Sequence, residues 1–312
     1  MLTASHLASF ALVLLTLATA PFCLAEAKSA KVSASARRPV KRLSADWNHV
    51  ERKLKEARFD RSFIKALHSS YETKDFKDAV ELNTLIFLKK GDYHAPQVTE
   101  NAVGRVRGFV TDHQAVLLTA EKENGVDPMV VASLLWMESR YGQNLGRFHV
   151  ASVYAHLLQL DRPSVLQHLK TDGPKRFDVK PNRAEKKKIV ARAKRKVEWA
   201  MAELKALEEI FKKRGRAPLE FRGSFAGAFG MSQFIPSSYA RWAKSAKGKA
   251  APDLNKPEDA IMSVAFYLRE NGWGPESRVK ALMRYNNSED YANAILALAE
   301  KSDIQSVASA AP

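Results

Sequence analysis

The sequence predicts an all-α fold. Apolar residues recur at helical spacing along most of the chain, as Trp47, Val50 and Leu54 do. Helix starts carry recognisable signals, such as Asp127-Pro128, in which a capping residue precedes proline at the first helical position. The sequence shows no sustained alternation of apolar and polar residues and no hairpin signal, so strands are not expected.

The composition is that of a globular protein with an unusual charge. The 312 residues are 46% hydrophobic and 27% charged, which argues against disorder throughout. A single cysteine excludes a disulfide framework and a thiolate-rich metal site. The net charge of +16 predicts attraction to a polyanion, which includes nucleic acid, anionic lipid and the acidic polymers of a cell envelope.

The first 25 residues contain no Lys, Arg, Asp or Glu. A mostly apolar run over 7–17 is followed by small residues up to Ala25, which predicts a secretory signal peptide at 1–25. A membrane anchor is disfavoured because the run is shorter than the ~20 residues that a spanning helix needs. Lipidation at Cys23 is disfavoured by the bulky Phe22 before it. We therefore expect an exported protein that is soluble after cleavage.

The rest of the chain divides into a leader, one domain and a tail. Residues 26–43 are polar, basic and aperiodic, and they predict a flexible basic leader. Helical patterns fill 44–301, and the small polar residues of 302–312 predict a flexible tail. The clearest helices within the domain are expected at four places: over 98–123, from Asp127 to Gly142, from Ala184 to Arg214, and from the Asn255-Lys256-Pro257 start to Asn271-Gly272.

Most of the excess positive charge is concentrated in one span. Between Lys175 and Arg216 there are sixteen Lys and Arg against six Asp and Glu, so this span carries +10 of the total +16. One interpretation is a solvated helix face, and the other is a surface that holds an anionic polymer. Nucleic acid is not the expected partner, because only Phe177 and Trp199 lie nearby for base stacking and the export signal points elsewhere.

Glu138 is the strongest candidate for chemistry. The apolar stripe of its helix includes Leu134 and Leu135, and Glu138 occupies the next position on that stripe. A carboxyl group at a core position is expected to have a raised pKa, so it can hold a proton near neutral pH and act as a general acid. The alternative is that Glu138 turns to the rim of the helix or pairs with Arg140.

Two further segments are candidates for ligand binding. Residues 223–239 contain three glycines within eight residues, which permit close approach of a ligand to the main chain. Gln233 in this segment supplies an uncharged amide suited to sugar hydroxyls and N-acetyl groups. The segment is not a phosphate-binding loop, because no Lys-Ser/Thr pair follows the glycines. Taken alone, it could equally be a tight connection between helices, and the polar stretch 284–288 could be only a turn.

Several segments in a fixed order carry a resemblance: Glu138-Ser139-Arg140-Tyr141-Gly142, Gly223 to Gly230, Gln233 to Tyr239, Asn271-Gly272-Trp273 and Tyr285-Asn286-Asn287-Ser288. Over roughly 45–300 the chain resembles the membrane-bound lytic murein transglycosylase B family. The resemblance implies a lysozyme-like helical domain in the periplasm that cleaves the MurNAc–GlcNAc bond of peptidoglycan glycan strands and leaves a 1,6-anhydro-MurNAc end. It implies Glu138 as the catalytic acid/base, and four residues that line the sugar groove: Ser224, Gln233, Tyr285 and Asn286.

The chain departs from the family pattern in three places. Residues 160–164 stand where the family has a Tyr-Pro-Arg-Arg segment, and the arginine pair is missing. Residues 244–249 are Lys-rich where some members carry an Asp-rich calcium loop, so we expect no metal and no cofactor. The span 162–223 is longer than usual, which predicts a basic helical insertion at about 165–200 that could contact anionic envelope polymers through 175–216.

Only one catalytic carboxylate is evident, whereas ordinary glycosidases use two. The resemblance implies that Glu138 acts alone, with the N-acetyl group of the substrate stabilising the reacting centre. One alternative is a muramidase on the same fold, in which Asp161 or another carboxylate activates water. A second is a peptidoglycan-binding protein without catalysis, which the missing arginine pair makes plausible.

Overall fold

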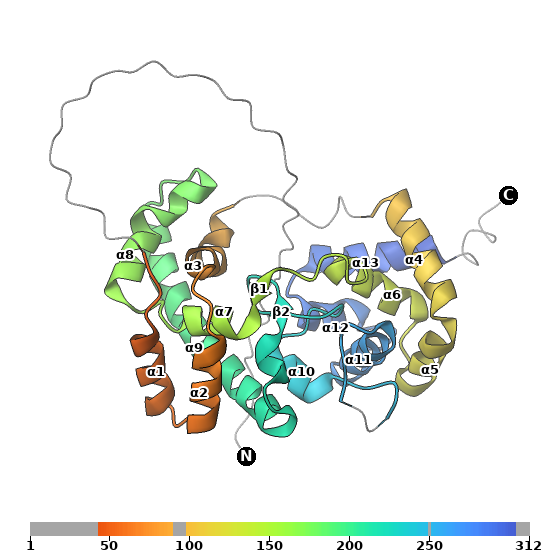
Figure 1. The fold of residues 1–312 in the computed structure, drawn as a ribbon. Helices are drawn as coiled ribbons and strands as arrows, with labels where there is room; N and C mark the ends of the chain where they lie inside the picture. The colour runs from red at the N-terminus through yellow and green to blue at the C-terminus, as the bar shows by residue number, and fades with distance from the viewer. Residues whose placement is uncertain (1–42, 90–97, 249–250, 304–312) are drawn as a thin grey trace, which may run out of the picture.

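The computed structural model describes residues 43–89, 98–248 and 251–303, so the predicted signal peptide, nearly all of the leader and most of the tail lie outside it. The described residues form two helical lobes (Figure 1). The N-terminal lobe contains α1 (Trp47–Glu56), α2 (Arg61–Ser70), α3 (Phe76–Leu85), α7 (Val150–Leu157), α8 (Pro163–Thr171) and α9 (Arg183–Arg214). The C-terminal lobe contains α4 (Glu100–Asp112), α5 (Gln114–Asn124), α6 (Pro128–Ser139), α11 (Pro257–Glu270), α12 (Arg278–Tyr285) and α13 (Glu289–Ser302).

A short antiparallel ribbon and one helix lie between the lobes (Figure 1). Strand β1 (Phe148–His149) pairs with β2 (Arg222–Gly223), and Phe148 lies opposite Gly223. A side chain at Gly223 would clash with the carbonyl oxygen of Ala228, so the close packing of backbone here requires glycine. Helix α10 (Pro236–Trp242) follows the ribbon. Single 3-10 turns occur at Ile86–Leu88, Gly173–Phe177 and Ala217–Glu220.

The centre of the C-terminal lobe is α6. Asp127 caps its first turn by accepting a hydrogen bond from the Met129 amide, and Pro128 occupies the first position, as the sequence predicts. Every residue from Val130 to Ser139 is buried, because α4, α5, α11 and α13 surround the helix. The spacing of apolar residues predicts one apolar stripe on α6, whereas the helix is covered on all sides.

Helix α9 is the backbone of the N-terminal lobe. Asn182 and Glu185 form a reciprocal capping box at its start. Its buried face packs on α3, α7, α8 and α10. The part of the chain predicted as a basic insertion therefore belongs to the packed lobe. Two of its basic residues are drawn into that packing: Lys196 is buried, and the Arg192 Nε donates to the carbonyl of Asn83 in α3.

The described residues confirm the all-α fold class, although the two-residue strands β1 and β2 were not expected and several helix bounds differ. The stretch 98–123 is two helices that meet at His113. Helix α6 ends at Ser139 rather than Gly142, because Arg140, Tyr141 and Gly142 all adopt positive φ. Helix α11 is preceded by Lys256 at the cap position, and Asn255 lies outside it. Helix α13 extends to the buried Ser302, one residue past the predicted boundary at 301.

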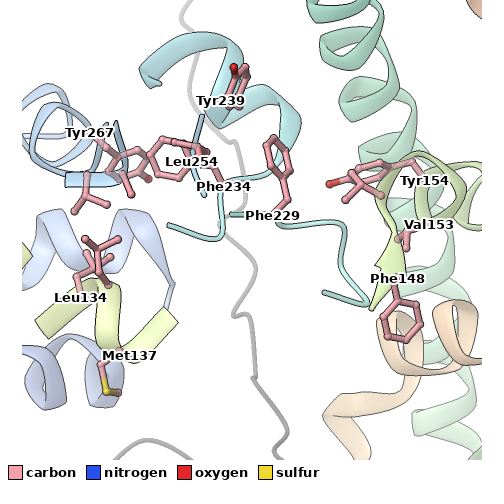
Figure 2. Close-up of a cluster of buried hydrophobic side chains, with 14 of the residues drawn as sticks. Leu134, Met137, Phe148, Val153, Tyr154, Phe229, Phe234, Tyr239, Leu254 and Tyr267 are labelled. Atoms are coloured by element: carbon pink, nitrogen blue, oxygen red, sulfur yellow. The ribbon is translucent and has the colours of Figure 1, made fainter. Parts of the chain in front are cut away.

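No helix among the described residues is both long enough and apolar enough to cross a membrane. The interior instead forms a hydrophobic core that continues from one lobe to the other. Figure 2 shows how this continuity arises, with Phe229 and Phe234 lying between Tyr154 of α7 and Tyr267 of α11. The segment that carries these two phenylalanines is the glycine-rich loop, residues 223–234.

Candidate active site

Glu138 lies in the last turn of α6, next to the connection that leads to β1. Its exposed fraction is 3%, as its position among apolar residues predicts. Its Oε1 accepts a hydrogen bond from the hydroxyl of Tyr291 in α13. Arg140 instead places its guanidinium 5.7 Å from the centre of the Trp136 ring. The expectation of a buried carboxyl group is therefore confirmed, and pairing with Arg140 is not observed.

Burial controls the protonation of Glu138. Loss of hydration raises the pKa of its carboxyl group from 4.5 to about 8, and the hydrogen bond from Tyr291 opposes this rise. At neutral pH the group is therefore mainly protonated and able to donate a proton. A carboxyl group with a pKa near the working pH is what general acid–base catalysis needs.

Three tyrosines surround this carboxyl group. Burial is the main cause that raises the pKa of both Tyr285 and Tyr291, and the nearby charge of Glu138 is the second cause. Both phenols therefore stay neutral. The ring of Tyr267 lies 4.7 Å from that of Tyr285, edge to face. No role was expected for Tyr267 or Tyr291 from the sequence. The available signal was their place on the inward faces of α11 and α13, where a buried phenol needs a polar partner.

The end of α6 is bonded directly to the glycine-rich loop. The Ser139 hydroxyl donates to the carbonyl of Met231 at 2.8 Å and accepts from the Gly142 amide at 3.0 Å. In the same region the Tyr285 hydroxyl donates to the carbonyl of Ser232. These bonds place residues 231–233 of the glycine-rich loop beside the turn that follows Glu138.

Ser224 is a buried residue of this loop, next to the half-buried Phe225 and Ala226. Its Oγ accepts hydrogen bonds from the amides of Ala226 at 3.3 Å and Ala228 at 3.2 Å. Because both contacts use the oxygen as acceptor, the hydroxyl proton remains available to a ligand. The structure thus makes Ser224 a candidate hydrogen-bond donor.

Gln233 and Asn286 carry buried polar atoms without a protein partner. The Gln233 Nε2 donates to the carbonyl of Gly230 at 3.0 Å, while its Oε1 is buried and unpartnered. The Oδ1 and Nδ2 atoms of Asn286 are both buried and unpartnered, and so is the Oγ of Ser232. Buried polar groups are normally paired, so this group is suited to a polar ligand that supplies both donors and acceptors.

The predicted site residues are therefore only partly brought together. Tyr285 joins the surroundings of Glu138, and the loop bonds place Gln233 in the same region. For Ser224 the structure gives contacts only within the glycine-rich loop. Asp161 is held elsewhere, because its carboxylate is paired with Lys53 and with the His49 ring of α1 at 2.9 Å. It is committed to the N-terminal lobe and not to the surroundings of Glu138.

The loop that the sequence analysis compared with a calcium site is closed by protein groups. The carboxylate of Asp259 accepts from the amides of Ala246 at 2.8 Å and Asp253 at 2.7 Å. The Ser263 hydroxyl accepts from the amide of Lys244 at 2.9 Å. Within 43–89, 98–248 and 251–303, no group of three or more His, Cys, Asp or Glu side chains is placed to hold a metal ion.

Comparison with known proteins places this arrangement in a family. The model of the transglycosylase SLT domain matches residues 33–281, which include Glu138 and the glycine-rich loop. The chain belongs to this family. Membrane-bound lytic murein transglycosylase B of Escherichia coli (strain K12) is a relative with 24% identity over 228 residues, which are 73% of this chain and 53% of that protein. The chain thus spans about half the length of this curated relative.

Solved structures of lytic transglycosylases share the fold of this chain. The lytic transglycosylase Slt35 of Escherichia coli, solved with bulgecin A and with calcium, has a TM-score of 0.61 at 19% identity over 88% of this chain and 100% of its own. SltB3 from Pseudomonas aeruginosa, solved with NAG-NAM-pentapeptide, has a TM-score of 0.61 at 19% identity over 81% of this chain and 78% of its own. The lysozyme-like transglycosylase fold predicted from the sequence is confirmed.

Proposed function

We propose that this chain is a peptidoglycan lytic transglycosylase that cleaves the MurNAc–GlcNAc β-1,4 bond and forms 1,6-anhydro-MurNAc, with Glu138 as its single acid/base. The observation that carries the proposal is the buried Glu138 carboxyl group, whose pKa is raised to about 8. Family membership and the relative SltB3, which has been solved with both NAG-NAM-pentapeptide and NAG-anhNAM-pentapeptide, support the same substrate and product.

The reaction needs one group that first gives a proton and then takes one. Protonated Glu138 donates to the glycosidic oxygen as the bond to C1 of MurNAc breaks, and GlcNAc leaves with a free hydroxyl. The substrate's N-acetyl group stabilises the positive charge that develops at C1. The C6 hydroxyl oxygen then bonds to C1, and its proton returns to Glu138. Atoms and charge balance without water, and the carboxyl group ends in the state in which it began.

The groove residues supply complementary polar contacts. Ser224 has a hydroxyl proton to donate, and Gln233 and Asn286 offer buried amide atoms without partners. An N-acetyl sugar presents an amide N–H, a carbonyl and several hydroxyls, so it provides the donors and acceptors that these atoms lack. We assign Ser224, Gln233, Tyr285 and Asn286 to glycan binding, with Tyr285 acting as part of the groove wall.

Hydrolysis on the same fold is the second candidate reaction. It needs a carboxylate to activate water about 6.5–9.5 Å from the acid, or a nucleophile at about 5–5.5 Å. The pairing of Asp161 with α1 argues against that residue in this role. The two candidates differ in product, because only hydrolysis adds an oxygen atom from water.

Mass spectrometry of sacculi digested in oxygen-18 water tests the proposal. The expected products are anhydro-muropeptides without label. Reducing-end MurNAc that carries the label would replace the proposal with hydrolysis. Intact sacculi that nevertheless retain the protein would replace it with binding alone.

We also propose that the enzyme works after export to the periplasm and that no metal or cofactor takes part. The uncharged apolar segment 1–25 supports export, although it lies outside the described residues. N-terminal sequencing of the mature protein is expected to begin at or near Glu26. A protein that retains Met1, or that carries lipid on Cys23, would contradict this assignment.

The basic span 175–216 is proposed to hold anionic envelope polymers. On α9 the side chains of Lys186, Lys187 and Lys188 are exposed, as are those of Lys194 and Arg195. They form a dense positive surface on the N-terminal lobe, which supports attraction to a polyanion. The buried Lys196 lies outside this surface.

A further inference from the structure

Hydrogen bonds within the glycine-rich loop account for part of its conformation. Within residues 224–228, the amide of Gly227 donates to the carbonyl of Ser224 at 2.9 Å, and the amide of Ser224 donates to that of Ala228 at 2.8 Å. Gly227 and Gly230 have φ of +77° and +71°, which other residues rarely adopt. A loop so rich in glycine has many alternative conformations, so something outside it must select this one.

Tyr154 supplies one external contact. It lies in α7 with its side chain fully buried, and its hydroxyl donates to the carbonyl of Gly227 at 3.1 Å. Its ring lies so close that a side chain at position 227 would overlap it. Behind it, the Trp199 ring of α9 packs edge-on at 5.4 Å. Figure 2 shows Tyr154 on the side of the loop opposite to Tyr267.

Asn83 supplies a second external contact from another helix. It lies in α3 with an exposed fraction of 1%, and its Nδ2 donates to the carbonyl of Phe225 at 2.6 Å. The same amide donates to the carbonyl of Ala79 at 2.9 Å, which fixes its orientation along α3. Asn83 is separated from Phe225 by 142 positions in sequence, so the contact joins the lobe to the loop directly.

We infer that Asn83 and Tyr154 are positioning residues, which hold the carbonyls of Phe225 and Gly227 from the N-terminal lobe and so set the glycine-rich loop for glycan binding. This inference rests on the proposed function. The two carbonyls flank Ala226 in the stretch whose amides donate to the Ser224 Oγ, so holding them also helps to hold the Ser224 oxygen in place. Neither residue touches the reacting atoms.

The inference predicts a change in substrate binding rather than in chemistry. When the loop already has its binding conformation, glycan binding does not have to order it. Loss of one hydrogen bond makes the free loop less ordered, so part of the free energy of glycan binding is then spent on ordering it. A single neutral hydrogen bond corresponds to about a 2- to 10-fold change in an equilibrium. We expect Y154F and N83L to raise KM for glycan by about this factor while kcat stays near that of the wild type.

The control is Y239F. Tyr239 is also buried, and its hydroxyl donates to the carbonyl of Pro252 at 2.6 Å, in a different loop. Both Tyr→Phe changes keep the ring and remove one hydrogen bond to a carbonyl, and Y239F also removes the bond that the Tyr239 hydroxyl accepts from Arg214, so the control loses more than the test variant. A merely structural role for Tyr154 predicts that Y154F and Y239F lower Tm and leave KM unchanged. A positioning role predicts that only Y154F raises KM.

The experiment combines amide hydrogen exchange of the free protein with kinetics on glycan strands. Exchange over residues 224–230 should be faster in Y154F and N83L than in the wild type or Y239F. Wild-type exchange in Y154F, or faster exchange with unchanged KM, would overturn the inference, and Y154F suffices should N83L not fold. Wild-type protein that releases no product would refute the proposed function instead, while the exchange comparison still decides whether Tyr154 positions the loop.

Discussion

Tyr291 donates a hydrogen bond to Glu138 across 153 positions of sequence. The contact exists because α13 packs against α6 more extensively than any other pair of described helices. A phenol in this place has two effects. It satisfies one oxygen of a buried carboxyl group, and it favours the charged form that must exist briefly between proton donation and proton recovery.

Replacing Tyr291 with phenylalanine is expected to shift the pH dependence of the reaction. The hydrogen bond lowers the pKa of Glu138, so its loss should raise that pKa beyond about 8. The enzyme needs protonated Glu138, so the basic limb of the kcat/KM profile should move to higher pH. The recovery of the proton loses a stabilising donor, so kcat should fall by about tenfold, as for loss of a hydrogen bond to a charged group.

The matched control is Tyr267→Phe, because the Tyr267 hydroxyl donates to the carbonyl of Arg284 at 2.7 Å and not to Glu138. Its basic limb should stay where the wild type has it. An unchanged limb in Tyr291→Phe would show that this hydrogen bond does not tune the acid.

The burial of Glu138 could be predicted from sequence because helical spacing is a local property. Two leucines three and four positions earlier indicate that Glu138 faces inward, although α6 is in fact buried on every side. The tyrosines could not be predicted as its partners, because α11, α12 and α13 reach Glu138 only through tertiary packing. Periodicity tells which face of a helix is buried, and it carries no information about which helix covers that face.

The basic span shows a related limit. Counting charges treats Lys186 and Lys196 alike, yet the first is exposed and the second is buried. The Nζ of Lys196 lies 3.7 Å from the centre of the Trp199 ring, and burial lowers the pKa of Lys196 well below the ordinary value. A long aliphatic stem lets a lysine follow either course, so only the packing of the lobe decides between them.

Removal of divalent cations is expected to leave the protein unchanged. The carboxylate of Asp259 binds the two amides that close the loop before α11, so closure does not require a cation. Addition of a chelator should change neither Tm nor activity. Asp259→Asn should cost about 1–3 kcal/mol of stability, because an amide group then faces backbone N–H donors. Asp253→Asn is the control in the same loop, because this more exposed carboxylate accepts from a single backbone amide, that of Asn255 at 3.1 Å. A chelator-sensitive Tm would reveal a bound metal.

Acid is expected to destabilise the N-terminal lobe through His156. This ring is buried in α7 between Tyr71 and Phe76, and burial lowers its pKa from 6.5 to about 3. Between pH 6.5 and pH 3, His156 is protonated in the unfolded chain and neutral in the folded protein. Stability is therefore lost as pH falls from about 6.5 towards 3, at a rate approaching 1.4 kcal/mol per pH unit.

His156→Leu tests this directly. At pH 7.5 both side chains are neutral, so the difference in unfolding free energy measures packing alone. As pH falls the wild type should lose stability faster than the variant, and the difference should shift in favour of leucine. Parallel curves from pH 7.5 to pH 4 would assign the acid sensitivity to other groups.

Binding to sacculi should depend on charge in one part of the surface. Changing Lys186–Lys188 to glutamine removes three exposed charges from α9 and should reduce binding severalfold at low salt with little change in Tm. The control changes Lys122, Lys280 and Lys301, which are exposed on the C-terminal lobe, so the net charge falls equally. Exposed charges are screened over about 10 Å at 0.1 M salt, so the difference should shrink as salt rises. Equal binding by both variants would mean that sacculus binding depends on the net charge of the protein and not on the lysines of α9.

Glu138→Gln separates chemistry from stability. The amide keeps the size of the side chain and can still accept from Tyr291, but it cannot donate a proton to the leaving oxygen. General acid–base catalysis contributes about 10²–10⁴-fold, and one residue here serves both half-steps. Release of anhydro-muropeptides should therefore fall by at least this factor, with binding to sacculi retained. A folded glutamine variant with full activity would remove Glu138 from the mechanism.

The stability of the same variant should depend on pH in a definite direction. The pKa of Glu138 is about 8 in the folded protein against 4.5 in the unfolded chain, so folded protein holds a proton that unfolded protein releases. The wild type therefore loses stability as pH rises from about 4.5 through 8, by up to about 1.4 kcal/mol per pH unit, whereas glutamine does not titrate. The unfolding free energy of Glu138→Gln relative to that of the wild type should increase between pH 5 and pH 8 and become constant above pH 8. A difference in unfolding free energy that is constant over this range would mean that Glu138 is ionised in the folded enzyme, and that it could not serve as the acid.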